Sequence, residues 1–263
     1  MASEISPKAE ISPKAKIGDN CKIFPFVYIE DDVVIGDNCI IFPFVSILDG
    51  TRMGSHNKVH QGSVIGALPQ DFDFRGERSL VEIGDDNVIR ENVIINRATH
   101  EGCKTVIGNG NFLMESVHIS HDTKIGDHNV FGYGTKIAGD CEIGNGVIYS
   151  SSVIENAGTR VGDLAMLQAG TRFSHDVPPY AIAGGNPVAY IGPNEPMMGT
   201  WHIDEKVQKH VANAYRLLFH SNNSTFDATL QIQSQVPDGK EIQKIVSFLQ
   251  TSKAGIITKD INR

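Results

Sequence analysis

The sequence lacks several features that would point to a simple function class. No apolar run in its 263 residues reaches the ~18 residues that a membrane-spanning helix needs. The net charge of −8 argues against general binding to nucleic acids or to anionic membranes. No P-loop, Gly-x-Ser-x-Gly or Cys-x-x-Cys motif is present. Nothing at the N-terminus resembles a signal peptide, so we expect a cytoplasmic protein with no transmembrane segment and no nucleic-acid partner.

Cysteine is also scarce, with four residues in the whole chain. Cys21 and Cys39 lie eighteen residues apart, and Cys141 occupies the same slot of the repeat described below. We interpret all three as buried thiols that act as small apolar residues. A disulfide between Cys21 and Cys39 is geometrically conceivable but not required. With no Cys-x-x-Cys motif present either, we expect no metal and no cofactor.

What the chain does contain is a repeat. The stretch IGDNCKIFPFVYIEDDVV, from residue 17, is followed at once by IGDNCIIFPFVSILDGTR. Large apolar residues recur six apart from Ile5 to Ile65, and again from Ile107 to Phe173, where only Glu155 interrupts them. A period of six fits neither a helix (3.6) nor a single strand (2). It fits a short strand plus a turn, used three times to close a triangular coil of eighteen residues.

The larger spacing supports the triangle. Pro7, Pro25 and Pro43 are eighteen apart and should lie on one corner, where a fixed φ is useful and the missing N–H is not needed. We therefore predict a parallel β-helix of hexapeptide repeats over residues 5 to about 178, in which each aliphatic residue stacks on its equivalent one coil away.

The hexapeptide repeat is interrupted at two places. If the Ile-Gly column continues, loops leave the coils near residues 66–82 and 100–106. Helical periodicity begins after the Pro- and Gly-rich segment 176–187, over residues 203–220 and 239–250, with a capping box at Ser224 and Asp227 between them. The predicted organisation is a β-helix over 1–190 and a helical domain over 191–263.

The uninterrupted repeats also predict which surface residues are neighbours. His121 should stack with Gly139, and His118 with Lys136 and Arg172, on outward-facing columns. Two imidazoles beside a basic strip suit an elongated anionic ligand. Exposed histidines on such corners are often only solvated surface, and the spacing by itself leaves both interpretations open.

Four segments carry a family resemblance. They are GALPQDFDF (66–74), VIRENVIINRAT (88–99), SVHISHDTKIGD (116–127) and DVPPYAIAGGNP (176–187), in this order and followed by a helical tail. Together they resemble the acyl-[acyl-carrier-protein]–UDP-N-acetylglucosamine O-acyltransferases, which begin lipid A synthesis. The resemblance runs over essentially the whole chain and implies a left-handed β-helix, whose hand is opposite to the usual crossover rule.

The resemblance also implies an activity and a homotrimer with active sites between neighbouring prisms. The activity is transfer of a 3-hydroxyacyl chain from acyl carrier protein to the 3-hydroxyl of UDP-N-acetylglucosamine. His121 matches the general base and Gly139 the backbone donor to the oxyanion, while Asp122 either orients His121 or serves as a corner residue. The matching substrate-binding positions are His118, Gln70, Asp71 and Asn194.

The sequence departs from the family pattern at several positions. A Lys of the first loop is replaced by Asp73, and an Arg pair falls on Thr200 and Trp201. Two further His positions are occupied by Asp140 and Asn156. Ala169 stands where a Gly often limits the acyl pocket, and its methyl group favours a shorter or differently seated chain.

Three alternatives follow. A related trimeric acyltransferase would use another nucleotide sugar or acyl-CoA. A zinc-dependent carbonic anhydrase shares this fold and binds zinc through histidines, but the spacing of His118 and His121 does not resemble that family's. An inactive structural prism would explain the missing cations.

Overall fold

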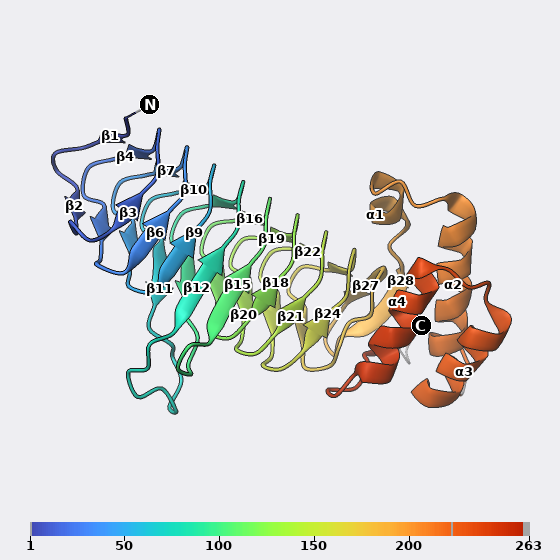
Figure 1. Cartoon of the computed structure of the whole chain (residues 1–263). Coiled ribbons are helices and arrows are strands. Elements are labelled where there is room, and N and C mark those ends of the chain that lie inside the picture. The colour runs from blue at the N-terminus through green and yellow to red at the C-terminus, as the bar shows by residue number, and fades with distance from the viewer. Residues whose placement is uncertain (1, 222, 260–263) are drawn as a thin grey trace.

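The computed structural model describes residues 2–221 and 223–259, which form a three-sided parallel β-helix with helices at its C-terminal end. Figure 1 shows the coils stacked in chain order, with the connection between β11 and β12 projecting from the prism. The predicted parallel β-helix is thus confirmed, and the strand pairs within it are parallel in the register of the repeat.

Each side of the prism is one sheet, built from every third strand up to β26, and β27, β28 and β29 extend the first sheet beyond the coils. The first sheet contains β1 (Glu4–Ile5), β4 (Lys22–Ile23), β7 (Ile40–Ile41), β10 (Lys58–Val59), β13 (Val88–Ile89), β16 (Phe112–Leu113), β19 (Val130–Phe131), β22 (Ile148–Tyr149), β25 (Met166–Leu167), β27 (Ala181–Gly184), β28 (Ala189–Pro193) and β29 (Thr258–Lys259). The second contains β2 (Glu10–Ile11), β5 (Tyr28–Ile29), β8 (Ser46–Ile47), β11 (Val64–Ala67), β14 (Ile94–Asn96), β17 (His118–Ile119), β20 (Lys136–Ile137), β23 (Ile154–Glu155) and β26 (Arg172–Phe173). The third contains β3 (Lys16–Ile17), β6 (Val33–Ile35), β9 (Thr51–Met53), β12 (Leu80–Ile83), β15 (Lys104–Ile107), β18 (Lys124–Ile125), β21 (Glu142–Ile143) and β24 (Arg160–Val161).

Three edges join these sheets, and each is named here by a residue type that marks it. The proline edge joins the first sheet to the second and includes residues 6–9, 24–27, 42–45, 132–135 and 168–171. The histidine edge joins the second sheet to the third and includes residues 120–123, 138–141 and 156–159. The glycine edge joins the third sheet to the first and includes residues 18–21, 36–39, 126–129, 144–147 and 162–165. Pro7, Pro25 and Pro43 lie on one edge, as predicted.

The core is a stack of the predicted aliphatic residues. Ile119 pairs with Ile137 one coil further on, and both are fully buried. Each such isoleucine contributes about 1.5–3 kcal/mol by leaving water. Cys21, Cys39 and Cys141 are buried free thiols, which confirms their interpretation, whereas Cys103 is exposed.

The glycine edge explains why the motif Ile-Gly-Asp-Asn repeats. The Asp19 N–H donates to Asp37 Oδ1 of the next coil at 2.7 Å, and this carboxylate lies against the Cα of Gly18. A Cβ at Gly18 would overlap the Asp37 side chain and lie 2.7 Å from the Gly36 carbonyl carbon. Close approach of neighbouring coils, rather than a positive φ, therefore requires glycine here.

The chain leaves the repeat through an antiparallel hairpin, β27–β28, and then forms helices α1 (Glu195–Thr200), α2 (Glu205–Phe219), α3 (Thr225–Gln235) and α4 (Lys240–Thr251). The predicted helices over 203–220 and 239–250 are confirmed as α2 and α4, although α2 begins later because Asp204 caps it. Ser224 caps α3 by accepting from the Asp227 N–H, as its sequence predicts. None of the helices described is long and apolar enough to cross a membrane.

Candidate active site

His121 lies on the histidine edge, just after β17, with its ring against the backbone of Gly139 one coil away. A Cβ built at Gly139 would stand only 2.7 Å from His121 Nε2, so any side chain here would displace the imidazole. The His121 side chain keeps 12% of its area exposed and therefore does not point into the core. The predicted adjacency of these two residues is confirmed.

Asp122 holds the imidazole in place. Its Oδ2 lies 3.0 Å from His121 Nδ1 and also accepts from the N–H of Thr99 at 3.0 Å and from its hydroxyl at 2.7 Å. Burial alone would raise the pKa of Asp122, but the bonds from Thr99 and His121 outweigh it and hold that pKa below its usual value. Because an ionised carboxylate only accepts, Nδ1 carries the hydrogen and Nε2 is left as the proton acceptor.

A second carboxylate faces the other ring nitrogen. Asp71 Oδ2 lies 3.5 Å from His121 Nε2, on the projecting loop between β11 and β12. The base of this loop is held by Asn96, whose Nδ2 donates to Leu68 O at 2.6 Å. Gln70, beside Asp71, is exposed. A hydroxyl that entered here would meet both an acceptor nitrogen and a carboxylate.

The basic strip follows the second sheet. His118 pairs in register with Lys136, and this column continues through Ile154 to Arg172, as predicted. Lys136 and Arg172 are exposed. Burial, with smaller contributions from Lys136 and His121, lowers the pKa of His118, so its imidazole is neutral near pH 7.

The backbone of Gly139 has one hydrogen-bonded group and one donor that is free within the described part of the chain. Its carbonyl accepts from the Gly158 N–H at 3.0 Å. Its own N–H has no acceptor among the residues that the structure describes. An unpaired backbone donor beside an imidazole is the arrangement that stabilises an oxyanion formed in acyl transfer.

Two predicted site residues lie elsewhere on the chain. Asn194 precedes α1 near the glycine edge. Its side chain makes no capping bond to the helix but donates from its amide to Leu164 O at 2.8 Å, and the residue is only 2% exposed. Ala169 is exposed on the proline edge. A single chain therefore does not bring Asn194 or Ala169 to His121, because the three residues stand on three different edges of a rigid prism.

The departures from the family pattern also separate in space. Asp73 is on the projecting loop, where its N–H donates to Asp71 Oδ1 at 2.7 Å. Asp140 and Asn156 lie on the histidine edge. Thr200 ends α1, and Trp201 follows it.

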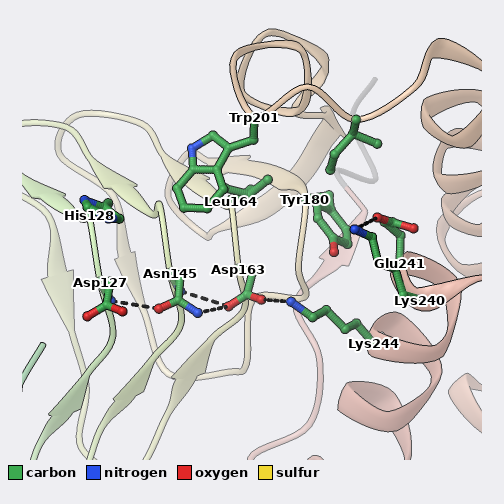
Figure 2. A pocket seen from close by; sticks show the side chains of 11 residues that line it. Asp127, His128, Asn145, Asp163, Leu164, Tyr180, Trp201, Lys240, Glu241 and Lys244 are labelled. Carbon is green, nitrogen blue, oxygen red and sulfur yellow. Dashed lines mark hydrogen bonds and ion pairs between the residues drawn. The ribbon is translucent and has the colours of Figure 1, made fainter. Parts of the chain in front are cut away.

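Trp201 borders a cavity of about 410 Å³ between the glycine edge and the helical tail, shown in Figure 2. Its ring lies edge-on to His128, with centroids 6.2 Å apart. The charges in this cavity are largely paired with one another, since Lys244 binds Asp163 and Lys240 lies 3.6 Å from Glu241. The cavity is thus a mixed-charge hollow on a different edge from His121.

Thr99 is the residue of this site that sequence reasoning missed. It lies in the connection between β14 and β15, one of the two places where the repeat is interrupted. Its contact to Asp122 spans 23 residues rather than eighteen, so the column argument could not find it. Within residues 2–221 and 223–259, no three His, Cys, Asp or Glu side chains are grouped to hold a metal ion.

Family models match both parts of the chain. A model described as UDP N-acetylglucosamine O-acyltransferase, domain 2, matches residues 176–257. A model of the bacterial transferase hexapeptide, with six repeats, matches residues 14–41, 34–67 and 104–139.

Relatives cover most of the chain. The acyl-[acyl-carrier-protein]–UDP-N-acetylglucosamine O-acyltransferase of Myxococcus xanthus (strain DK1622) is 32% identical over 207 residues, which is 78% of this chain and 80% of the relative. Solved UDP-N-acetylglucosamine acyltransferases are similar in structure as well. The one from Bacteroides fragilis 9343 is 47% identical with a TM-score of 0.94, over 96% of this chain and 99% of that one. The one from Francisella novicida is 32% identical with a TM-score of 0.94, over 98% and 95%. The chain therefore belongs to the family of acyl-[acyl-carrier-protein]–UDP-N-acetylglucosamine O-acyltransferases.

Proposed function

We propose that this protein transfers a 3-hydroxyacyl chain from acyl carrier protein to the 3-hydroxyl of UDP-N-acetylglucosamine, the first step of lipid A synthesis. Family membership supports the reaction. The observation that carries the site assignment is the ring of His121, oriented by Asp122 and lying against Gly139, whose N–H has no acceptor among the described residues.

The chemistry needs a base because a sugar hydroxyl is a weak nucleophile. His121 Nε2 removes the hydroxyl proton as the oxygen attacks the thioester carbonyl carbon. The carbonyl oxygen becomes an anion, to which the Gly139 N–H donates. The intermediate then collapses, the C–S bond breaks, and the carrier thiol leaves with the proton returned by the imidazolium. The products are the sugar ester and free acyl carrier protein.

The remaining residues have binding roles in this proposal. Asp71 and Gln70 contact the sugar, and the neutral imidazole of His118 lines the same face. Lys136 and Arg172 contribute electrostatically to docking of the carrier protein along the second sheet. Asp122 is a positioning residue, because it contacts His121 rather than substrate.

A homotrimer completes the site in this proposal. His121, Asn194 and Ala169 lie on three edges of one prism, so they can contact one substrate only if neighbouring copies contribute them. Light scattering tests this, with a single mass of three chains expected and a monomer at working concentration contradicting it. A cytoplasmic location stays a prediction, which cell fractionation would test.

The decisive experiment is incubation of the purified protein with 3-hydroxyacyl carrier protein and UDP-N-acetylglucosamine, with mass spectrometry of the products. The expected result is a new ester on the sugar together with free carrier thiol. Parallel reactions with other UDP-sugars and with acyl-CoA test the related-acyltransferase alternative. That alternative is motivated by Asp73, Thr200 and Trp201, which stand where the family pattern has cationic residues. No transfer in any reaction would contradict the proposal and favour an inactive structural prism. Metal analysis together with a CO₂ hydration assay tests the carbonic anhydrase alternative.

A further inference from the structure

Glu155 is the one residue that breaks the apolar register between residues 107 and 173, and its position has no role in the mechanism above. It ends β23, points inward, and is only 1% exposed. The core around it is otherwise apolar, so burial of a carboxyl group here costs free energy unless hydrogen bonds satisfy it. Its neighbours are Tyr149 in β22, Thr159 on the histidine edge, and Cys141.

These neighbours form a continuous chain of hydrogen bonds. The Tyr149 hydroxyl donates to Glu155 Oε2 at 2.6 Å. Glu155 Oε1 lies 3.0 Å from Thr159 Oγ1, which in turn lies 2.8 Å from the Asn156 carbonyl oxygen. If Glu155 carries a proton on Oε1, it donates to Thr159, and the hydroxyl hydrogen of Thr159 is free to reach Asn156. Every donor of the chain then has an acceptor.

The chain ends on the turn that supports Gly139. Thr159 closes the turn 156–159, whose Gly158 N–H donates to Gly139 O at 3.0 Å. The backbone carbonyl of Glu155 accepts from the Ala138 N–H at 3.1 Å. The peptide groups immediately before and after the one that carries the Gly139 N–H are therefore both fixed by the coil that contains Glu155.

We propose that Glu155 is a positioning residue of the acyl-transfer centre, which acts through Thr159 to hold the turn beneath Gly139. This inference rests on the proposed function of the His121–Gly139 pair. An aliphatic residue would fill the same slot and pack well, but it would leave Thr159 without its donor. The polar residue thus fixes the direction of one hydroxyl at the point where the backbone donor must be precise to a fraction of an ångström.

The network requires Glu155 to be neutral. Burial raises the pKa of Glu155 to about 8, although the bonds from Tyr149 and Thr159 oppose that rise. The facing groups do not ionise first, since burial raises the pKa of Cys141 and of Tyr149 well above their usual values. Asp176, the nearby carboxylate, is paired with Arg160 at 3.0 Å. When Glu155 ionises, Thr159 turns its hydrogen to the carboxylate and releases Asn156, so turnover should fall as the pH rises through about 8.

Stability should show the same titration. The folded-state pKa of Glu155 lies above its ordinary value of 4.5, so the stabilising contribution of the protonated form is complete below pH 4.5 and is lost as the pH rises to about 8. Within this range each pH unit of increase raises the unfolding equilibrium constant about tenfold, because Glu155 must lose its proton on unfolding. Glu155→Gln removes this dependence, because an amide does not titrate.

The test compares three variants over pH 6 to 9.5, with kcat and KM measured at each pH and rates corrected for thioester hydrolysis without enzyme. Glu155→Gln should keep turnover near pH 7 and lose the alkaline fall. Thr159→Val should lower kcat by about tenfold with little change in KM, since it cuts the link to Asn156 without altering the fold. Thr51→Val is the matched control, because Thr51 is also buried and donates to a carbonyl three residues back, Leu48 O at 2.7 Å. Its pH profile should equal that of the wild type.

Two results would overturn the inference. One is a Glu155→Gln profile with the same alkaline fall as an active wild type. The other is an unchanged kcat in Thr159→Val. If the wild type transfers no acyl group, the proposed function fails instead, and the denaturation curves still report on Glu155. Equal pH dependence of unfolding in the wild type and Glu155→Gln would then show that the carboxyl group is not held neutral in the core.

Discussion

The histidine edge and the glycine edge are made of the same backbone coils, but they differ in whether their backbone N–H groups have acceptors. Along the glycine edge each coil satisfies the next, as in the bonds from Asp127 N to Asn145 Oδ1 and from Asn145 N to Asp163 Oδ1, both 2.8 Å. On the histidine edge the Gly139 N–H has no acceptor among the described residues, and His121 Nε2 lies 3.5 Å from Asp71 Oδ2. An edge that satisfies its own donors holds the coils together, whereas one that leaves them open can act on a substrate.

The largest expected effect is on the histidine edge. His121→Ala should fold normally and lose about 100-fold or more in turnover, because the proposed general base is removed while the core is untouched. Steady-state kinetics with 3-hydroxyacyl carrier protein measures this effect. His56→Ala is the control, since His56 is an exposed histidine that bonds Asn38 on the glycine edge. Equal turnover in the two variants would remove His121 from the mechanism.

Two glycine substitutions should have different effects on the two edges. Gly139→Ala should reduce turnover about tenfold or more with little loss of stability, because the added methyl displaces the ring of His121, which can rotate away. Gly126→Ala should destabilise the fold by about 1–3 kcal/mol, because its Cβ would stand 2.8 Å from the Gly144 carbonyl oxygen, a backbone atom that cannot move aside.

Denaturation curves and kinetics of both glycine variants measure this contrast. Gly158→Ala is a control for Gly126→Ala, because its Cβ would meet nothing within 4 Å and only the positive φ of 71° adds strain. If Gly139→Ala loses as much stability as Gly126→Ala, the two edges do not differ in the way described.

The smallest effect is expected on the second sheet. Lys136→Ala and Arg172→Ala should each raise KM for the acyl carrier protein a few-fold at low salt. The difference from wild type should vanish near 1 M salt, where the Debye length is about 3 Å. Lys124→Ala, on the third sheet and paired with Glu142 at 3.7 Å, is the control. Unchanged KM at low ionic strength would refute a docking role for the strip.

The sequence predicts most of the fold because one physical rule, parallel stacking at i and i+18, applies to nearly every coil. That rule placed His121 against Gly139 and aligned His118 with Lys136. It could not place Thr99, because the interrupted repeat changes the spacing to Asp122. It also could not place Asn194 or Trp201, which follow the last coil, where α1 is too short to show an amphipathic pattern and contains Pro196 and Gly199.

Glu155 illustrates a different limit of prediction from sequence. Its interruption of the apolar pattern is visible in the sequence, but its partners Tyr149 and Thr159 become evident only when the coil closes around it. A polar residue in an inward slot can signal a defect, a stabilising network or a positioning device. Only the geometry of its hydrogen bonds distinguishes these interpretations.

The most direct test of the account is a crystal structure of the protein with UDP-N-acetylglucosamine bound. The account predicts the sugar on the histidine edge, with its 3-hydroxyl oxygen about 2.6–3.2 Å from His121 Nε2. A sugar seated instead in the hollow beside Trp201 on the glycine edge (Figure 2), with His121 touching no part of it, would contradict the account.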